Sequence, residues 1–342
     1  MKIGIVGYQG SGKSTLFSWL TGVDADPALA HVTQSHMTEV LDPRMKRLYE
    51  IYKPKKETHA RLEIVDTPGL SRSHEGSAQK LALIREAGCL IVVVAAYDTT
   101  DPAADLRNFA DDLLIADLDI VSGRVERLRE AVKKPRANRE EQVEELEALE
   151  PLLKILEGGQ PLHTIQLAPE QERAIKSFQL FARKPRFVIF NTSELETDPG
   201  RFQSLAGPEV PSAAVSLAMQ RDLARMAEAE RAEFCAEMGV AVLDRQELIQ
   251  RIMDSSGQMV FFTAGEKEIR TWLIRRGSTA VEAAGAIHTD LARGFVRAET
   301  MTCDDLFRLG SEREIKANNL MRQEPKDYVI RDGDIITIRH NA

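Results

Sequence analysis

The stretch KIGIVGYQGSGKSTLF, residues 2 to 17, constrains the fold more than any other part of the chain. Lys2 to Val6 is a short apolar run typical of a buried strand, and Ser14 to Trp19 has the pattern of a helix start. The glycines between them predict a tight turn whose backbone N–H groups converge on one anion, with the dipole of the following helix adding to the attraction. Strand, glycine-rich turn and helix in this order predict a phosphate site in an α/β domain.

The turn has the pattern G-x-x-x-x-G-K-S, formed by Gly7, Gly12, Lys13 and Ser14. In such a loop Lys13 is expected to reach the β and γ phosphates of a nucleotide, and the Ser14 hydroxyl is expected to ligate Mg²⁺. A glycine-rich turn that binds nothing is the alternative. The nucleotide-binding residues expected in this segment are Gly7, Gln9, Gly10, Ser11, Gly12, Lys13, Ser14 and Thr15.

A second motif, Asp66-Thr67-Pro68-Gly69, directly follows the apolar run RLEIVD. Asp66 is therefore expected at the carboxyl end of a strand, on the side where ligands bind in open α/β sheets. There it can hold Mg²⁺, commonly through water, while the Gly69 N–H is placed to sense a γ phosphate. Lys13, Asp66 and Gly69 are thus the expected catalytic residues.

Thr33 is the candidate for a loop threonine that completes the Mg²⁺ coordination when a γ phosphate is present. Its neighbourhood, AHVTQSHMT, also contains Thr38, and a solvated loop hydroxyl remains an alternative. The expected metal ligands are Ser14, Thr33 and Asp66.

A third segment, Asn191-Thr192-Ser193-Glu194, follows the run RFVIF and is expected to contact the base. In guanine-specific switches an N-K-x-D segment offers an aspartate that accepts two hydrogen bonds from guanine. Here Thr192 and the longer Glu194 replace that lysine and aspartate, so the fit to guanine is lost. A displaced Glu194 is compatible with adenine, and Asn191 can contact N7 of either base. Backbone contacts to the base edge are expected from Ser216, Leu217 and Ala218.

The bulk composition is that of a globular protein. The chain has 342 residues, 43% of them hydrophobic and 29% charged, and no apolar run approaches the length of a membrane span. The three cysteines lie far apart without metal or redox spacing, which fits a reducing, cytoplasmic compartment, and no membrane association is expected. A net charge of −8 argues against a protein that coats nucleic acid, so no DNA binding is expected and any RNA contact must be local.

Apolar strand-like runs recur at residues 61–66, 89–95, 186–190 and 212–216, which predicts a mostly parallel sheet. Between the second and third runs, apolar residues repeat at helical spacing over 114–132 and 143–156, on either side of the turn KKPRAN. They predict an antiparallel helical hairpin inserted into the sheet domain. A further helix is expected from Glu170 to about Phe181.

The C-terminal segment has its own α+β pattern. VFFTA, EIRTWLI and GFVRAE are strand-like, Thr279 to His288 is helix-like, and Asp332-Gly333 between two apolar runs predicts a two-residue β-hairpin. We expect a nucleotide-binding domain over residues 1–116 and 183–255, a hairpin domain over 117–182 and a C-terminal domain over 256–342.

Two groups of basic residues are candidates for a local RNA contact, although ordinary solvated charges are the alternative for both. The first lies at the hairpin tip and the second in the C-terminal domain. They are Lys133, Lys134, Arg136 and Arg139, and Arg275, Arg276, Arg293 and Arg297.

The order of phosphate loop, DxxG, helical hairpin, NxxE and small β-rich domain resembles the YchF family, Obg-related P-loop ATPases and GTPases, over essentially the whole chain. The segments at 41–56, 174–181, 261–299 and 326–341 look especially similar, and the last two are like the family's TGS domain, a ubiquitin-like β-grasp module. The resemblance implies an ATP-preferring, ribosome-associated and RNA-associated hydrolase. The family's NxxE is matched by Asn191 and Glu194, and its hydrophobic residue after the DxxG glycine is matched by Leu70.

The chain departs from the family pattern at several positions. Gln9-Gly10-Ser11 replaces Pro-Asn-Val, and D-T-P-G replaces D-I-A-G. The loop DTTDPAADL is shortened and has no counterpart of a histidine proposed to assist hydrolysis in family members, while His74 is more consistent with a surface residue. We therefore expect slow intrinsic hydrolysis, which a partner or K⁺ could raise.

Two functions remain open from the sequence. The first is a slow Mg²⁺-dependent ATPase that also accepts GTP and acts as a regulatory switch on the ribosome. In this case the protein is expected to be a monomer that contacts the large subunit or RNA through the TGS-like domain and the hairpin. The second is a nucleotide-gated binding module with little or no hydrolysis. A small-molecule kinase shares the phosphate loop, but the order of DxxG and NxxE argues against it.

Overall fold

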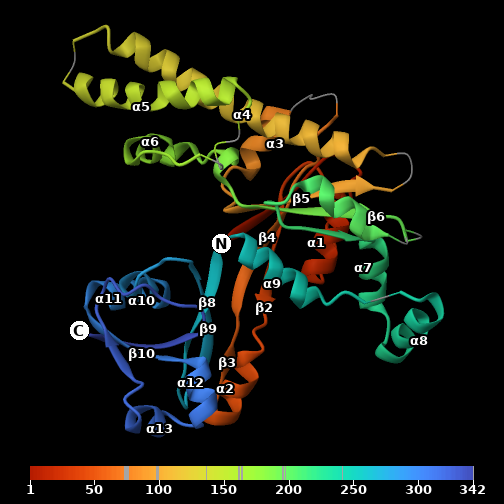
Figure 1. Cartoon of the computed structure of the whole chain (residues 1–342). Helices are drawn as coiled ribbons and strands as arrows, with labels where there is room; N and C mark the ends of the chain where they lie inside the picture. Colours follow the sequence, from red (N-terminus) through yellow and green to blue (C-terminus); the bar gives the residue numbers. More distant parts are fainter. Residues whose placement is uncertain are drawn as a thin grey trace. The chain divides into compact units, whose positions relative to one another are not determined.

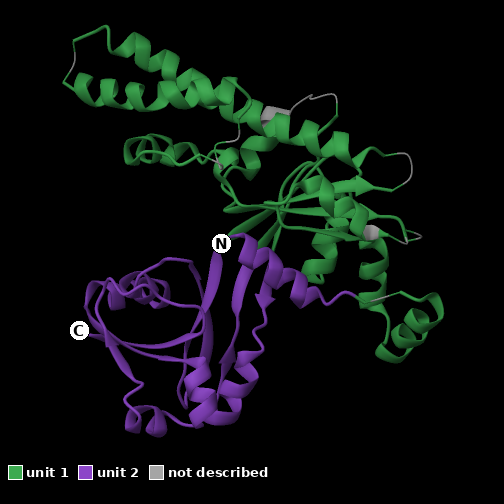
Figure 2. Ribbon diagram, in the orientation of Figure 1, with its two compact units in different colours: residues 1–36, 63–242 green, residues 37–62, 243–342 purple. Residues whose placement is uncertain are grey.

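The computed structural model describes residues 1–72, 77–97, 100–135, 137–160, 162, 165–194, 196, 198–240 and 242–341 (Figure 1). It divides into two compact units (Figure 2). Unit 1 is Met1–His36 with Glu63–Val242, and unit 2 is Met37–Leu62 with Leu243–Ala342. The assignment of residues 37–62 to the C-terminal unit was not foreseen from the sequence, and the expected three-domain boundaries stay a prediction.

The first sheet has the strand order β2-β4-β1-β5-β6-β7. Its strands are β1 (Lys2–Val6), β2 (Gln34–Val40), β4 (Ala60–Asp66), β5 (Cys89–Ala96), β6 (Arg186–Thr192) and β7 (Ser212–Val215). The pairs β1–β4, β1–β5, β5–β6 and β6–β7 are parallel, which confirms the predicted sheet. Because β5 is buried along its whole length, its unbroken apolar sequence is that of a central strand.

Helices of unit 1 include α1 (Lys13–Thr21), α3 (Ser77–Ile84), α7 (Leu217–Arg225) and α8 (Glu228–Met238), with 3₁₀ turns at Pro27–Leu29 and Pro199–Ala206. The first three bury side chains in this unit, whereas α8 has no buried residue. One core cluster joins Val92 and Val94 of β5 to Leu81 of α3 and to Phe109 of α4 (Pro102–Ala131). The carboxyl ends of the parallel strands are thereby held at one edge, where ligands bind in this class of fold.

The predicted helical hairpin is present between β5 and β6 (Figure 1). It consists of α4 (Pro102–Ala131) and α5 (Arg139–Glu157), whose apolar stripes meet in a second core cluster that includes Val121, Val125 and Leu149. Arg124 pairs with Glu145 across the two helices. Arg136, one of the predicted tip residues, lies outside the described residues. None of the helices in the described ranges is long and apolar enough to cross a membrane.

The helix predicted from Glu170 to about Phe181 is shorter than expected. α6 spans Pro169–Ile175, and two 3₁₀ turns, Lys176–Phe178 and Phe181–Arg183, follow it. The chain leaves the helical path at Gln179, which has a φ of 50°. The helical periodicity therefore continued past the point at which the backbone turns back to the sheet.

Unit 2 contains a second sheet, with the order β11-β10-β12-β8-β9-β3. The strands are β3 (Glu57–Thr58), β8 (Gln258–Thr263), β9 (Ile269–Arg275), β10 (Phe295–Thr302), β11 (Arg322–Glu324) and β12 (Asp334–His340). The helices are α2 (Arg44–Tyr52), α9 (Arg245–Ser255), α10 (Ala280–Ile287), α11 (Thr289–Arg293), α12 (Cys303–Leu309) and α13 (Glu312–Ala317). The first and last strands of the C-terminal segment, β8 and β12, pair in parallel in the middle of the sheet, as in a β-grasp module.

The two-residue hairpin predicted at Asp332-Gly333 is wrong. The residues before this turn form no strand beyond a single bridge between Val329 and Thr279, and β12 pairs instead with β10 and β8. The turn is held by distant groups, because the Val260 N–H donates to Asp332 Oδ1 at 3.1 Å and the Gly333 N–H donates to the Val260 carbonyl at 3.0 Å. Tertiary contacts decide the strand pairing here.

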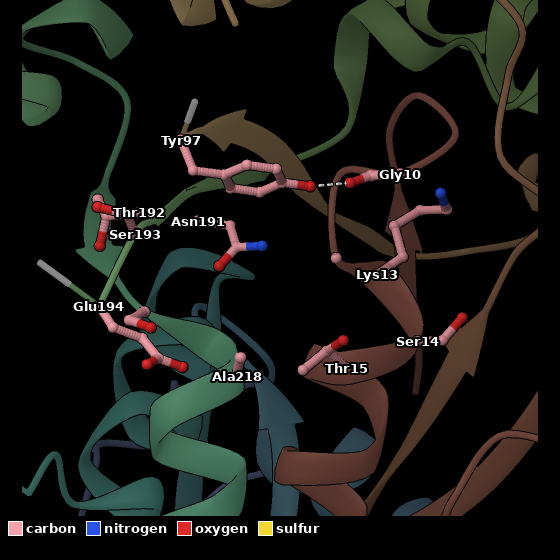
Figure 3. Close-up of a pocket in the computed structure, with 12 residues that line it drawn as sticks. Gly10, Lys13, Ser14, Thr15, Tyr97, Asn191, Thr192, Ser193, Glu194 and Ala218 are labelled. Atoms are coloured by element: carbon pink, nitrogen blue, oxygen red, sulfur yellow. Dashed lines mark hydrogen bonds between the residues drawn. The ribbon is translucent and has the colours of Figure 1, made fainter. Parts of the chain in front are cut away.

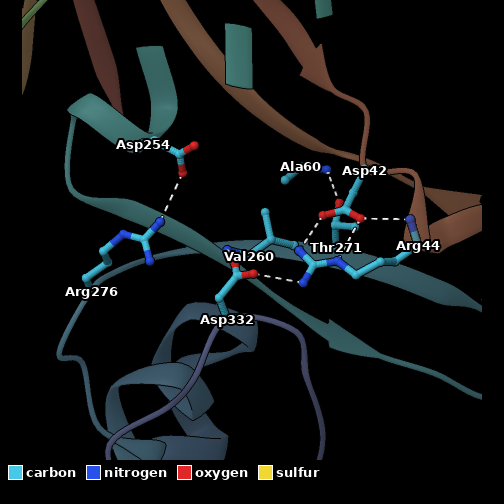
Figure 4. Close-up of polar contacts among 8 residues, drawn as sticks. All are labelled: Asp42, Arg44, Ala60, Asp254, Val260, Thr271, Arg276 and Asp332. Carbon is cyan, nitrogen blue, oxygen red and sulfur yellow. Dashed lines mark hydrogen bonds and ion pairs between the residues drawn. The ribbon is translucent and has the colours of Figure 1, made fainter. Parts of the chain in front are cut away.

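Residues 37–62 are integrated into unit 2 by side-chain contacts (Figure 4). The Arg44 guanidinium bonds Asp42 at 2.6 Å and Asp332 at 2.8 Å, and it lies 5.0 Å over the ring of Phe262. The Ala60 N–H donates to Thr271 Oγ1 at 2.6 Å. These contacts make α2 a structural part of the C-terminal unit.

Candidate nucleotide site

The glycine-rich turn connects β1 to α1, as the sequence predicts. Gly12 caps α1 with a φ of 102°, and a Cβ on it would lie 2.3 Å from Nδ2 of Asn191. Only glycine fits this position. The same Asn191 amide donates to the Ser11 carbonyl at 3.0 Å, so the turn is tied to the end of β6.

A pocket of about 550 Å³ opens beside this turn (Figure 3). It is lined by residues of the turn and α1, of the end of β6, of the segments that follow β5 and β6, and of the start of α7. They are Gly10, Gly12, Lys13, Ser14, Thr15, Tyr97, Asn191, Thr192, Ser193, Glu194, Ser216 and Ala218. The pocket brings together most of the predicted nucleotide-binding residues, although Gly7, Gln9, Ser11 and Leu217 are not among those that line it. Its volume is in the range of small-molecule sites.

Lys13 is buried, with 7% of its surface exposed. Its ammonium donates to the Tyr8 carbonyl at 2.9 Å. The pKa of Lys13 is lowered to about 8, mainly by burial; the carboxylate of Asp66 opposes this shift and the charge of Lys80 adds to it. A neutral carbonyl is a weak partner for a buried ammonium, so the site is poised to accept an anion.

Asp66 and Ser14 form an oxygen pair that fits Mg²⁺. The Ser14 hydroxyl donates to Asp66 Oδ2 at 2.7 Å. Asp66 Oδ1 is buried and has no hydrogen-bond partner among the described residues. Burial raises the pKa of Asp66, while the bond from Ser14 and the charge of Lys13 lower it. Carboxylate and hydroxyl oxygens suit a hard divalent cation, and the unsatisfied Oδ1 provides a ligand for it.

Gly69 lies directly against the phosphate turn. A Cβ on it would be 2.8 Å from Nζ of Lys13 and 2.9 Å from Cα of Gln9. The Gln9 N–H donates to the Leu70 carbonyl at 2.9 Å, and the Leu70 N–H donates to the Gly7 carbonyl at 3.1 Å. The segment after β4 is thus joined to the turn by backbone hydrogen bonds.

Asn191 connects three parts of the pocket. Besides its bond to the Ser11 carbonyl, its Oδ1 accepts the Leu217 N–H at 3.1 Å at the start of α7. The amide therefore positions the turn relative to the base side of the pocket. Contact with N7 of a base stays a prediction.

Glu194 is exposed at the mouth of the pocket, and Figure 3 shows its carboxylate beside Ala218. Ser216 precedes α7 and also lines the pocket, so the expected base-side residues do meet. The predicted base preference depends on Glu194 and stays a prediction.

Sequence reasoning missed Tyr97. This residue directly follows β5, and its ring extends along the pocket so that the hydroxyl donates to the Gly10 carbonyl (Figure 3). Its position in the sequence could have identified it, since the residue that directly follows a central parallel strand lies at the edge of the sheet where ligands bind. Thr192 and Ser193 also line the pocket, and their place within the NTSE segment could have identified them.

Thr33 does not line this pocket. It is exposed and lines another pocket, of about 380 Å³, together with Thr67, Glu63 and Lys2. Its role in metal coordination stays a prediction. His74, considered above as a possible aid to hydrolysis, lies outside the described residues.

Two protein-family models match the chain. Residues 2–121 match MMR_HSR1, described as a 50S ribosome-binding GTPase, and residues 259–341 match YchF-GTPase_C, described as a protein of unknown function (DUF933). The two matches cover the phosphate turn at one end of the chain and the β-grasp sheet at the other.

Similar proteins include the "Ribosome-binding ATPase YchF" of Escherichia coli O157:H7, 33% identical over 100% of this chain and 99% of that protein. The "Obg-like ATPase 1" of Oryza sativa subsp. japonica is 34% identical over 100% of this chain and 92% of that protein. The solved structure of the Schizosaccharomyces pombe YchF GTPase superposes with a TM-score of 0.84 at 27% identity, covering 99% of this chain and 97% of that one. Identity above 30% along the whole chain places this protein in the YchF family.

Proposed function

We propose that this protein is a Mg²⁺-dependent nucleoside triphosphate hydrolase that prefers ATP to GTP. The observation that carries the proposal is the single pocket that joins the GKS turn to the NTSE segment. A phosphate-binding turn and a base-side segment in one pocket are what a nucleotide requires. The names of the relatives, ribosome-binding ATPase and Obg-like ATPase, support the same activity.

On the phosphate side, Lys13 would bind the β and γ phosphates through its ammonium, and Gly69 would donate its N–H to the γ phosphate. Ser14 and Asp66 would hold Mg²⁺, with Thr33 as a further candidate ligand. The ion would supply positive charge that offsets the charge developing on the phosphoryl group. The chain's own residues orient the phosphates for attack by water in line with the leaving oxygen.

On the base side, the carboxylate of Glu194 decides the preference. Guanine presents an N–H at N1 and an amino group beside it, which an aspartate in this segment accepts together. Adenine presents a lone pair at N1, so a carboxylate in that place would repel it. The longer Glu194, which lines the pocket together with Ala218, would hold its carboxylate away from that place, which supports ATP as the preferred nucleotide.

We further propose that the protein is a cytoplasmic monomer that associates with the large ribosomal subunit or its RNA. The printed names of the relatives support ribosome association. The helical hairpin and the TGS-like β-grasp sheet of residues 256–342 are the proposed contact elements. K⁺ is proposed as an activating ion.

A nucleotide-gated module with little hydrolysis is the second candidate, because of Leu70. This residue stands where many switches carry a water-positioning glutamine, and its side chain is buried, with 3% exposed. It offers no group to orient water. In this alternative, ATP orders the segment after β4 without being hydrolysed.

The variant Glu194→Asp tests the base assignment. The shorter carboxylate returns to the guanine-reading position, so we expect the ratio of ATP to GTP affinity to fall at least about tenfold, a change of about 1.4 kcal/mol. The exposed Glu209→Asp is the matched control and should leave the ratio unchanged. Titration calorimetry with both nucleotides measures it. An unchanged ratio in Glu194→Asp would contradict the role of Glu194.

A further inference from the structure

Two lysine ammonium groups converge on Gly69. Lys80, in α3, donates from Nζ to the Gly69 carbonyl at 2.9 Å. Lys13 approaches the same residue from the phosphate turn, since a Cβ on Gly69 would lie 2.8 Å from its Nζ. The residue expected to sense the γ phosphate through its N–H is therefore flanked by two positive charges.

Both ammonium groups rest on neutral backbone carbonyls. Lys13 donates to the Tyr8 carbonyl at 2.9 Å, just as Lys80 donates to that of Gly69. In the ranges that the structure describes, neither lysine has a carboxylate within ion-pair distance. Two like charges in a partly desolvated site repel each other, and an anion bound between them would remove that cost.

The neighbouring cation, Arg72, is already engaged. Its Nε donates to Asp105 Oδ1 at 3.0 Å, its Nη2 donates to Oδ2, and it lies 5.2 Å over the ring of Tyr8. To reach a phosphate it would have to leave a bidentate carboxylate partner. Lys80 has only to exchange one carbonyl for a charged acceptor, on a flexible stem.

We propose that Lys80 is a catalytic residue that binds the γ phosphate as a second cation beside Lys13. The inference rests on the proposed hydrolase function. When the triphosphate binds, the Lys80 ammonium leaves the Gly69 carbonyl and donates to a γ-phosphate oxygen.

Water attacks the γ phosphorus, and the bond from that phosphorus to the bridging oxygen breaks. The electron pair of this bond goes to the β phosphate, and the proton of the attacking water is released to solvent with inorganic phosphate. Lys80 keeps its own proton throughout and offsets the charge on the transferring group. It would thereby supply a charge near the γ phosphate that the buried Leu70 cannot supply.

Lys80→Met tests the proposal in the full-length protein, with Lys80→Arg as the charge-conserving variant. Lys176→Met, an exposed lysine in the same unit, is the matched control. The measurements are steady-state ATP hydrolysis and calorimetric titration with ADP and with an ATP analogue whose β,γ-bridging oxygen is a methylene. Because ADP has no γ phosphate, its affinity separates loss of the γ contact from general damage to the pocket.

We expect Lys80→Met to lower kcat by about 100-fold to 1,000-fold, the usual effect of removing one charge-stabilising donor. It should weaken binding of the ATP analogue and leave the affinity for ADP within about twofold of the wild-type value. Lys80→Arg should keep most of the activity because it retains the charge. Lys176→Met should match the wild type. Wild-type kcat in Lys80→Met, or an equal loss of ADP and analogue affinity, would overturn the proposal.

Two further outcomes distinguish a failure of the proposed hydrolase function from a failure of the role of Lys80. If the wild-type protein binds ATP but does not hydrolyse it, the hydrolase function fails, and the ratio of analogue to ADP affinity alone decides whether Lys80 contacts the γ phosphate. If Lys80→Met does not fold, as judged by its melting curve, Lys80→Arg and Lys80→Gln are compared instead. Equal kcat in those two variants would overturn the proposal.

Discussion

At the scale of single residues, the burial of Lys13 makes nucleotide affinity depend on pH. With its pKa lowered to about 8, Lys13 is about nine-tenths protonated at pH 7 and about one-tenth protonated at pH 9. Phosphate binds the ammonium form and raises this pKa, so binding takes up a proton near pH 8. We expect ATP affinity to fall about tenfold between pH 7 and pH 9.

Calorimetry in two buffers of different ionisation enthalpy measures this proton uptake at pH 8. A lysine with its ordinary pKa near 10.5 would stay charged throughout this range and would take up no proton. Equal binding enthalpies in the two buffers, together with an ATP affinity that does not change up to pH 9, would contradict the buried-ammonium account.

The residues of the phosphate turn could be predicted from the sequence because their roles follow from local backbone geometry. Gly12 and Lys13 act within one short turn, and the pattern alone identifies them. Tyr97 and Lys80 could not be found in that way, since Tyr97 reaches the turn from 87 residues away and Lys80 reaches Gly69 from the next helix, 11 residues along the chain. Their partners are set by the tertiary structure.

At the scale of elements, Asp117 anchors the hairpin helix α4 to the sheet unit. Its carboxylate is fully buried, pairs with Arg85 at 2.8 Å and accepts the N–H groups of Phe181 and Ala182 at 3.0 and 2.7 Å. We expect Asp117→Ala to lower the free energy of unfolding by about 3–5 kcal/mol, because it leaves the partly buried Arg85 guanidinium without its carboxylate and two buried N–H groups without an acceptor.

Asp119→Ala, an exposed position on the same helix, should change the free energy of unfolding by less than about 0.5 kcal/mol. Urea denaturation followed by circular dichroism measures both variants. A loss below about 1 kcal/mol in Asp117→Ala would show that the anchor contributes little.

Elements with a strong periodic pattern could be predicted closely, and those chosen by distant partners could not. The apolar run at Lys2–Val6 coincides with β1, and both hairpin helices contain their predicted apolar repeats, although α4 already begins at Pro102. Asp332-Gly333 has the residues of a hairpin turn, but Val260 and Arg44 bind the Asp332 side chain. The local sequence pattern does not predict such distant partners.

At the scale of the whole molecule, the chain passes from one unit to the other at residues 36/37, 62/63 and 242/243. The short segment between the first two crossings completes unit 2 through Arg44 and Asp42. The Arg44 partner Asp332 is 288 residues away in the sequence, which is why this division could not be predicted.

We expect Arg44→Met to lower the free energy of unfolding of unit 2 by about 2–3 kcal/mol, because Asp42, 4% exposed, loses its cation. Lys46→Met, exposed on the same helix, is the control and should be neutral within about 0.5 kcal/mol. Trp272 fluorescence in a Trp19→Phe background reports unit 2 during denaturation, since the two tryptophans lie in different units. An unchanged midpoint in Arg44→Met would contradict this anchoring.

The measurement that tests the central claim most directly is calorimetric titration of the purified protein with ATP and with GTP, with and without Mg²⁺, alongside phosphate release. The account predicts tighter binding of ATP than of GTP, dependence on Mg²⁺, and slow release of phosphate. Binding without release would favour the nucleotide-gated module. Tighter binding of GTP would contradict the role of Glu194, and binding of neither nucleotide would contradict the site itself.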